Sequence, residues 1–145
     1  MIEKGINLRE AAPSDYQRII SVIPNWWGGR DLTALLPELF LEHFYDTSLV
    51  LERGIELVGF LVGFLSQAHP NEAYIHFVGV HPDFRKKGIG AILYEKFFEV
   101  CRNQDRTIVR AITSRVNTGS VAFHTRMGFQ VERGNKEIHF TKYLV

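Results

Sequence analysis

The chain has 145 residues, of which 46% are hydrophobic, and this is the length of one domain with a sizeable core. A formal net charge of +1 gives no bulk basicity, so the composition argues against nucleic acid or an anionic membrane as an obligatory partner. The single cysteine, Cys101, excludes an internal disulfide framework, and its position on an apolar helix stripe predicts a packed core thiol.

The N-terminal residues contain charged side chains and no long apolar run. We therefore expect neither a signal peptide nor a membrane anchor, and we predict a cytoplasmic protein. Residues 6–10 form the first predicted strand. A helix follows that Ser14 or Asp15 can cap, with apolar residues through Ile23, and Pro24 is expected to end it.

A tryptophan- and glycine-rich loop over residues 25–30 precedes a second helix, which Asp31 can cap and Pro37 can kink. This second helix is predicted over residues 32–44 from its apolar spacing. Six further strands are predicted from apolar and β-branched runs bounded by turn residues. They cover residues 48–52, 56–65, 74–80, 107–113, 129–132 and 137–144.

Two more helices are predicted, one after Gly90 and a short one that starts at Asn117 or Thr118. No internal repeat or linker interrupts this order of elements. The sequence therefore predicts a single domain over residues 1–145 with an α/β fold. Its sheet is expected to be mixed and mostly antiparallel, with six to seven strands flanked by about four helices.

The stretch from Tyr74 to Cys101 combines a strand, a basic glycine-rich turn over residues 85–90 and an amphipathic helix. A helix start leaves backbone N–H groups without partners and carries the positive end of the macrodipole, so cations and glycines there suit an anion. Gly88 and Gly90 allow a tight turn and close approach of a ligand to the backbone. The turn predicts a phosphate site, although a solvated basic turn has the same pattern.

Two other phosphate-binding loops are excluded by the residues that follow. A dinucleotide-binding loop requires a third glycine at the position of Leu93. A Walker-type loop requires lysine and then serine or threonine after its last glycine, whereas Ala91 and Ile92 follow Gly90.

The basic turn resembles the acetyl-CoA-binding motif of the Gcn5-related N-acetyltransferases (the GNAT superfamily), Arg/Gln-x-x-Gly-x-Gly/Ala, which Arg85, Gly88 and Gly90 match. The resemblance implies a single-domain GNAT-like fold in which the central strand separates from its neighbour, pantetheine pairs with that strand and the pyrophosphate rests on the turn. It implies acetyl-CoA as the acyl donor. The implied cofactor-binding residues in these two segments are Val78, Gly79, Val80, Arg85, Lys86, Lys87, Gly88, Ile89 and Gly90.

A second stretch, from Asn117 to Phe129, is similar to the family pattern N-x-x-A/S-x-x-x-Y-x-x-x-G-F. The resemblance implies that Asn117 helps to hold the cofactor, with Phe123 nearby, and that the residue at the tyrosine position protonates the departing thiolate. That residue is His124, and an imidazole with an ordinary pKa of ~6.5 can transfer a proton. A hydrogen-bonded packing role for His124 stays open.

The general base is harder to predict. Family members often carry a glutamate on the fifth strand, but Ile112 occupies that place. His76, on the central strand, is the alternative base, acting through ordered water, and a packing role stays open for it as well. A backbone N–H near residues 78–80 is expected to polarise the thioester carbonyl. The six histidines lack metal-ligand spacing, so no metal site is predicted.

The loop after the first helix is predicted to shape the acceptor site. In the GNAT family this region lies over the acceptor pocket, and two adjacent tryptophans cannot both easily face a core. We therefore predict that Trp26, Trp27 and Arg30 contact the acceptor, with Arg30 suited to a carboxylate or phosphate. The alternative is a tryptophan lid on the core with Arg30 in solvent.

The resemblance implies an acetyl-CoA-dependent N-acetyltransferase that acts on a primary amine by direct transfer in a ternary complex. The alternative is a non-catalytic sensor module that binds CoA or acyl-CoA. The expected partner is a small-molecule or peptide amine, without nucleic acid or membrane, and the possibility of a homodimer is left open.

Overall fold

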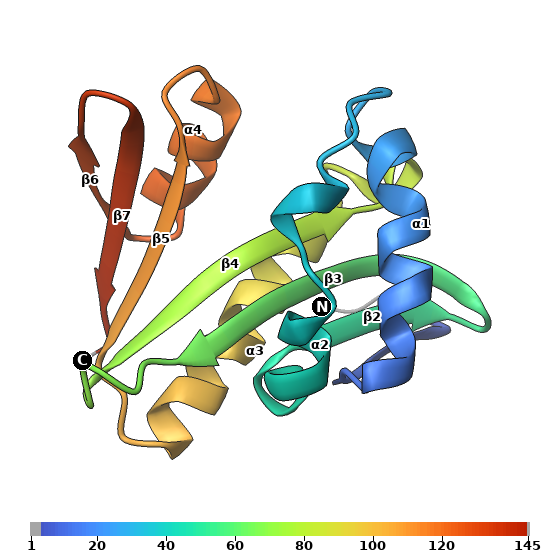
Figure 1. Ribbon diagram of the computed structural model, residues 1–145, viewed down its shortest axis with the longest axis horizontal. Helices are drawn as coiled ribbons and strands as arrows, with labels where there is room; N and C mark the ends of the chain where they lie inside the picture. The colour runs from blue at the N-terminus through green and yellow to red at the C-terminus, as the bar shows by residue number, and fades with distance from the viewer. Residues whose placement is uncertain (1–3, 145) are drawn as a thin grey trace.

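The computed structural model describes residues 4–144, which form one seven-stranded sheet in the order β1-β2-β3-β4-β5-β7-β6 (Figure 1). The strands are β1 (Ile6–Glu10), β2 (Leu49–Arg53), β3 (Glu56–Leu65), β4 (Glu72–Val80), β5 (Ile108–Ser114), β6 (Gln130–Arg133) and β7 (Glu137–Tyr143). In the part of the chain that the structure describes, only β4 and β5 pair in parallel. The predicted mixed, mostly antiparallel sheet is therefore confirmed.

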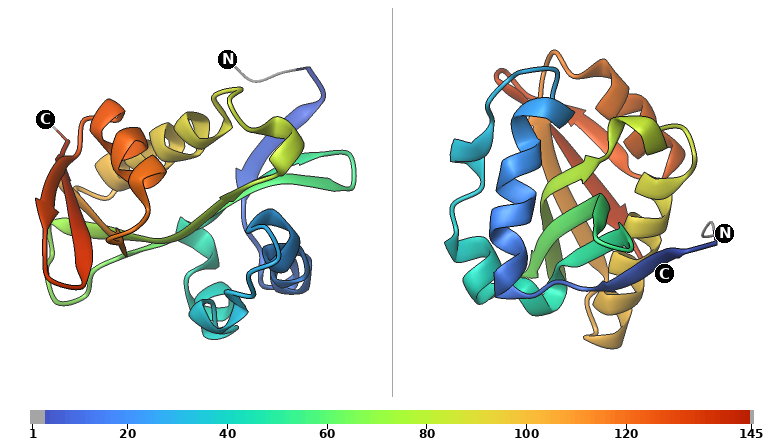
Figure 2. Two further views of the ribbon diagram at one scale, coloured as in Figure 1. Left: turned by 90° about the horizontal axis from the view of Figure 1, so that it is seen from above. Right: turned by 90° about the vertical axis from the view of Figure 1, so that its right-hand side faces the viewer.

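Within residues 4–144, four α-helices cover the two faces of this sheet (Figure 2). They are α1 (Tyr16–Trp26), α2 (Leu39–His43), α3 (Ile89–Asn103) and α4 (Thr118–Arg126). Helices α1 and α2 lie on one face, and α3 and α4 lie on the other. Each face has its own hydrophobic cluster, centred on Ile23 and Phe60 beneath α1 and on Leu93 and Phe97 beneath α3. The predicted α/β architecture is confirmed.

The first helix does not end at Pro24, as the sequence analysis predicted. Proline removes one backbone donor, but the Trp27 N–H still bonds to the Ile23 carbonyl at 3.1 Å, so the helix continues to Trp26. It ends where Gly28 and Gly29 adopt left-handed conformations, with φ of 65° and 91°.

The second predicted helix is broken rather than kinked. A 3₁₀ turn covers Thr33–Leu35, and the α-helical part is limited to α2. The break falls at Leu36, whose φ of −128° and ψ of 74° lie outside the helical region. The cause is Pro37, because a proline disfavours helical conformation in the residue before it.

Strand β4 contains a β-bulge at His76. In its pairing with β3, Phe77 lies opposite Val62 and Ile75 lies opposite Gly63, so His76 is the extra residue. The alternation of side chains between the two faces of β4 is therefore interrupted at His76. Ile75 packs in the cluster beneath α3, whereas Phe77 packs in the cluster beneath α1.

The bulge coincides with the end of pairing between β4 and β5. Their register stops at Ile75 opposite Ala111, although β4 continues to Val80 and β5 to Ser114. Beyond this point the two strands diverge, as Figure 1 shows. The sheet thus has an internal gap between the last residues of β4 and those of β5.

Candidate active site

The β4 side of this gap presents backbone groups. The His81 N–H donates to the Val58 carbonyl of β3 at 2.8 Å. Because peptide groups alternate in direction along a strand, the Gly79 amide also faces β3, and the amides of Val78 and Val80 face the gap. Of the three residues predicted on this strand, Val78 and Val80 can therefore offer their N–H groups to a ligand.

Gly79 leaves room for two aromatic side chains. A Cβ atom at this position would lie 2.6 Å from the Phe60 ring and 2.8 Å from the Trp27 indole. The absence of a side chain therefore allows both aromatic rings to pack against β4 at the gap.

The basic turn forms the start of α3, as predicted. Gly88 is the residue before the helix, with a φ of 79°, and Lys86 is also left-handed, with a φ of 63°. The Ile92 N–H bonds to the Gly88 carbonyl at 3.0 Å, so the preceding N–H groups lie ahead of the helical ladder. Ile89 is buried and anchors the turn, while Lys86 and Lys87 are exposed. This arrangement suits a bound anion.

Arg85 connects the turn to the gap. Its Nε donates to the Val80 carbonyl at 3.2 Å, and its Nη2 donates to the Trp26 carbonyl at the end of α1. A cation is favourable at the C-terminal end of a helix. Arg85 thus holds β4, α1 and the basic turn together.

The second motif packs directly on the first. A Cβ atom at Gly90 would lie 3.3 Å from the Phe123 ring, so this glycine allows α4 to approach α3 closely. Asn117 caps α4, because its Oδ1 accepts a hydrogen bond from the Ser120 N–H at 3.1 Å. The structure therefore brings Phe123 of the second motif beside Gly90 of the first.

His124 is buried, with 6% of its surface exposed, and both of its ring nitrogens have partners. Nδ1 lies 2.7 Å from the Ser120 carbonyl and Nε2 lies 2.8 Å from the Tyr94 hydroxyl. A carbonyl only accepts, so Nδ1 carries the proton and Nε2 accepts from Tyr94. The ring also stacks on Phe140, with centroids 3.9 Å apart. This is the packing environment that the sequence analysis left open, and proton donation by His124 would require one buried hydrogen bond to break.

Burial lowers the pKa of His124, despite the opposing hydrogen bond to Ser120, so folding favours the neutral ring. The stability this provides is present above the unfolded pKa of about 6.5 and is lost as the pH falls below it. We expect the free energy of unfolding, measured with urea, to fall between pH 7 and pH 5. His124→Phe, which keeps a stacked ring, should make that fall smaller, while His43→Gln at an exposed site should not. An equal fall in both variants would contradict the assignment.

His76 has only one ring nitrogen engaged in the contacts that the structure describes. Its Nε2 lies 2.6 Å from the Leu35 carbonyl, and its ring stacks on Phe40 with centroids 4.1 Å apart. Because a carbonyl only accepts, Nε2 carries the proton and Nδ1 keeps a free lone pair. His76 therefore both anchors the segment before α2 and presents a basic nitrogen.

The two adjacent tryptophans have different surroundings, since Trp26 lies in the core and Trp27 lies beside the gap. Trp26 is 2% exposed and stacks on Phe60, so its side chain has the core role named as the alternative. Trp27 is half-buried, packs edge-on against Phe77 and reaches Gly79 beside the gap. Arg30 is exposed. Of the three residues predicted to contact an acceptor, Trp27 thus lies at the gap.

Sequence reasoning missed Tyr74 and Tyr94. Tyr94 is the partner of His124, and Tyr74 stacks on Phe64 where β4 begins. Over residues 4–144 the structure contains no group of three or more His, Cys, Asp or Glu side chains that could hold a metal ion. The same residues include no helix long and apolar enough to cross a membrane.

Known proteins are similar to this chain in sequence and in fold. An uncharacterized N-acetyltransferase of Methanocaldococcus jannaschii is 35% identical over 89 residues, which are 59% of this chain and 39% of that protein. The chain thus spans well under half of that relative. The structure of Ard1 from Thermoplasma volcanium has a TM-score of 0.81 at 22% identity, covering 97% of this chain and 99% of that one.

A second solved structure, yncA from Salmonella typhimurium with its cofactor acetyl-CoA, has a TM-score of 0.75 at 18% identity. It covers 98% of this chain and 95% of that chain. The model of the acetyltransferase (GNAT) family matches residues 12–129, which carry both motifs and the divergent strands. The chain therefore belongs to the GNAT family of acetyltransferases.

Proposed function

We propose that this protein transfers the acetyl group of acetyl-CoA to a primary amine by direct transfer in a ternary complex. The observation that carries the proposal is the gap between β4 and β5, where the Val78 and Val80 amides lie beside the start of α3. A thioester carbonyl needs a hydrogen-bond donor, and a pyrophosphate needs a helix N-terminus. Both lie within one short segment of chain.

The proposed cofactor contacts follow from these positions. The pyrophosphate would bind the N–H groups at the start of α3, with Lys86 and Lys87 adding positive charge. Pantetheine would pair with the N–H groups of Val78 and Val80 that face the gap. Arg85 would act by positioning, because its guanidinium already bonds to two carbonyls.

The amine would approach from the face that α1 and α2 cover, beside Trp27 and His76. His76 would remove its proton through the free lone pair of Nδ1, directly or through water. The nitrogen then forms a bond to the acetyl carbon as the bond from that carbon to sulfur breaks, and the nitrogen, which is positively charged at this point, releases a second proton to water to give the neutral amide. CoA leaves as a thiolate, and because a free thiol has a pKa of only about 8.5, solvent can supply its proton. His124 would hold α4 in place rather than donate that proton.

The test is to measure binding and turnover on the same protein. Calorimetry should detect acetyl-CoA binding, and a panel of primary amines should include acceptors that release CoA from it. Binding of acetyl-CoA without CoA release for any amine would favour the sensor module instead. Failure to bind acetyl-CoA would rule out both functions.

A further inference from the structure

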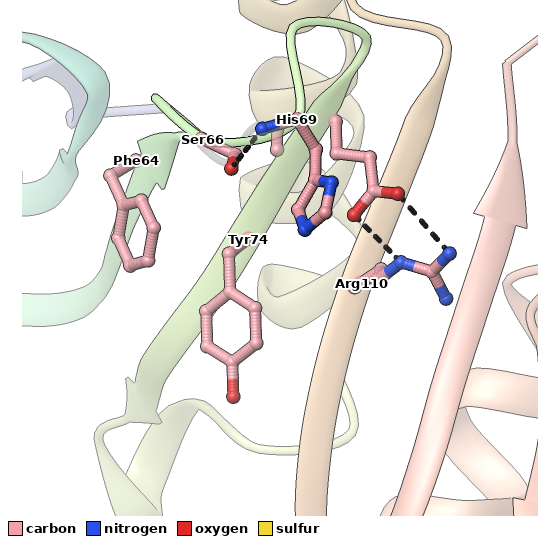
Figure 3. Close-up of a pocket in the computed structure, with 7 residues that line it drawn as sticks. Phe64, Ser66, His69, Tyr74 and Arg110 are labelled. Carbon is pink, nitrogen blue, oxygen red and sulfur yellow. Dashed lines mark hydrogen bonds and ion pairs between the residues drawn. The ribbon is translucent and has the colours of Figure 1, made fainter.

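A pocket of about 510 Å³ lies on the same face as α2, where β3 ends and β4 and β5 begin (Figure 3). One wall is aromatic, because Phe64 and Tyr74 stack with ring centroids 5.4 Å apart. His69 and Arg110 lie on the side of Tyr74 away from Phe64, and Glu72, which Arg110 binds, also lines the pocket. The pocket therefore combines aromatic faces with a carboxylate.

Glu72 is ionised and held in position. Arg110 binds it through two contacts, Nε to Oε1 at 2.8 Å and Nη2 to Oε2 at 3.2 Å. These bonds, opposed by partial burial, lower the pKa of Glu72. A carboxylate has about four lone-pair sites, so two remain for a ligand.

Arg110 is a poor receptor for an anion in this arrangement. The Nε and Nη2 groups of its guanidinium bind Glu72, and its Nη1 donates to the Thr141 hydroxyl at 3.0 Å. A ligand carboxylate could form the usual bidentate pair only by displacing Glu72. An alkylammonium group, in contrast, can bind the free Glu72 lone pairs and lie against the aromatic ring of Tyr74.

The loop between β3 and β4, which borders the pocket, is held in place by Arg106. Arg106 Nη1 donates to the carbonyls of Ser66, His69 and Glu72 at 2.7, 3.2 and 3.0 Å. The two N–H groups of this nitrogen are shared among the three carbonyls and hold both ends of the loop, so the pocket is preformed.

Tyr74 joins the pocket to the gap. Its hydroxyl points along β4 toward the end at which β4 and β5 diverge (Figure 3). Burial, together with the charge of Glu137, raises the pKa of Tyr74, so the hydroxyl stays protonated and can donate. Four residues of strand separate Tyr74 from Val78 and six separate Glu72 from Val78, which are distances of about 13 and 20 Å. One extended molecule can therefore reach both places.

We propose that this pocket binds a second cationic group of the acceptor, which is a linear diamine with its two nitrogens about 13 Å apart or more. The inference rests on the proposed function, because the first nitrogen is the one acetylated in the gap. At roughly 1.5 Å per bond, such a molecule has on the order of ten bonds between its nitrogens.

A length series of linear α,ω-diamines tests the proposal, with monoamines of equal length as controls. We expect kcat/KM to rise with length for the diamines, to level off once the second ammonium reaches Glu72, and to rise less for the monoamines. Glu72→Gln should lower kcat/KM for the longest diamines about 10- to 100-fold, the range for a hydrogen bond to a charged group. It should leave the shortest amines unchanged.

Glu95→Gln is the matched control, because it removes one exposed carboxylate from α3, on the opposite face of the sheet from the pocket. It should have no effect on any amine. Equal kcat/KM at all diamine lengths, or equal effects of the two substitutions, would overturn the inference while short amines still confirm acetyl transfer.

Calorimetry with a long diamine alone provides a readout that does not depend on turnover. The diamine should bind the protein without acetyl-CoA, and Glu72→Gln should weaken that binding about 10- to 100-fold. Absence of binding to the unsubstituted protein would refute the site even if no acceptor were ever acetylated.

Discussion

Replacing His76 with glutamine is expected to lower kcat by about 10² to 10⁴, the range that a general base contributes. The amide of glutamine can still donate to the Leu35 carbonyl, which His76 Nε2 contacts at 2.6 Å, but it has no basic nitrogen. The hydrogen bond to the Leu35 carbonyl would be kept, and the nitrogen that accepts the proton of the amine would be lost. Steady-state kinetics on a confirmed acceptor, with the Kd for acetyl-CoA measured in parallel, provides the check.

His76→Ala is the comparison, because it removes both the base and the anchor. We expect it to raise KM for the acceptor as well, since the segment that Leu35 and Phe40 hold over β4 would loosen. If His76→Gln keeps kcat within about threefold, the histidine only positions this segment. The amine would then lose its proton by another route.

Replacing Gly79 with valine is expected to reduce the free energy of unfolding by about 1–3 kcal/mol or more, the usual cost of overpacking. Already the first carbon of the new side chain would lie 2.6 Å from the Phe60 ring and 2.8 Å from Trp27. Neither ring has free space, because Trp27 also packs on Phe77 at 5.1 Å. Urea unfolding measures the loss, and displacement of Trp27 should appear in its fluorescence.

Gly119→Ala is the matched control for that substitution. Gly119 lies in α4, and the nearest atom to a new Cβ, Asn117 Oδ1, is 3.9 Å away. Alanine in a helix is favoured over glycine by roughly 1 kcal/mol, so this variant should be no less stable than the original. Unchanged stability in Gly79→Val would show that the two rings can move aside.

The features that the sequence predicted correctly depend on neighbours along the chain. The start of α3 follows from Gly88, because a left-handed residue before a helix strongly favours glycine. The hairpin at Gly54, with a φ of 60°, is equally local. The order of strands and helices follows in the same way from apolar spacing.

The bulge in β4 could not be predicted, because it exists only in the pairing with β3. His76 becomes an extra residue once Val62 and Gly63 lie opposite its two neighbours. Nothing in the alternation of residues 74–80 reports that shift. Side chains beyond His76 therefore lie on the opposite face of the sheet from the one that strict alternation would give.

The surroundings of His124 were also beyond sequence reasoning. Its partners Tyr94 and Phe140 come from α3 and β7, which are distant in the chain. The helix pattern was read from apolar residues alone, so a buried tyrosine did not stand out. A tyrosine beside Leu93 on a buried stripe was the available indication, since a buried hydroxyl requires a partner.

The diverging strands leave β4 with an edge inside the sheet rather than at its border. An exposed edge is normally a liability, because its unpaired amides can template pairing with another chain. Here α3 and α4 flank one face of that edge and α1 flanks the other. A ligand that pairs there acts as an eighth strand, and its binding energy adds to the stability of the fold by mass action. His76, the extra residue of β4, thus lies where pairing with β5 stops, and under the proposed function the cofactor would complete the sheet there.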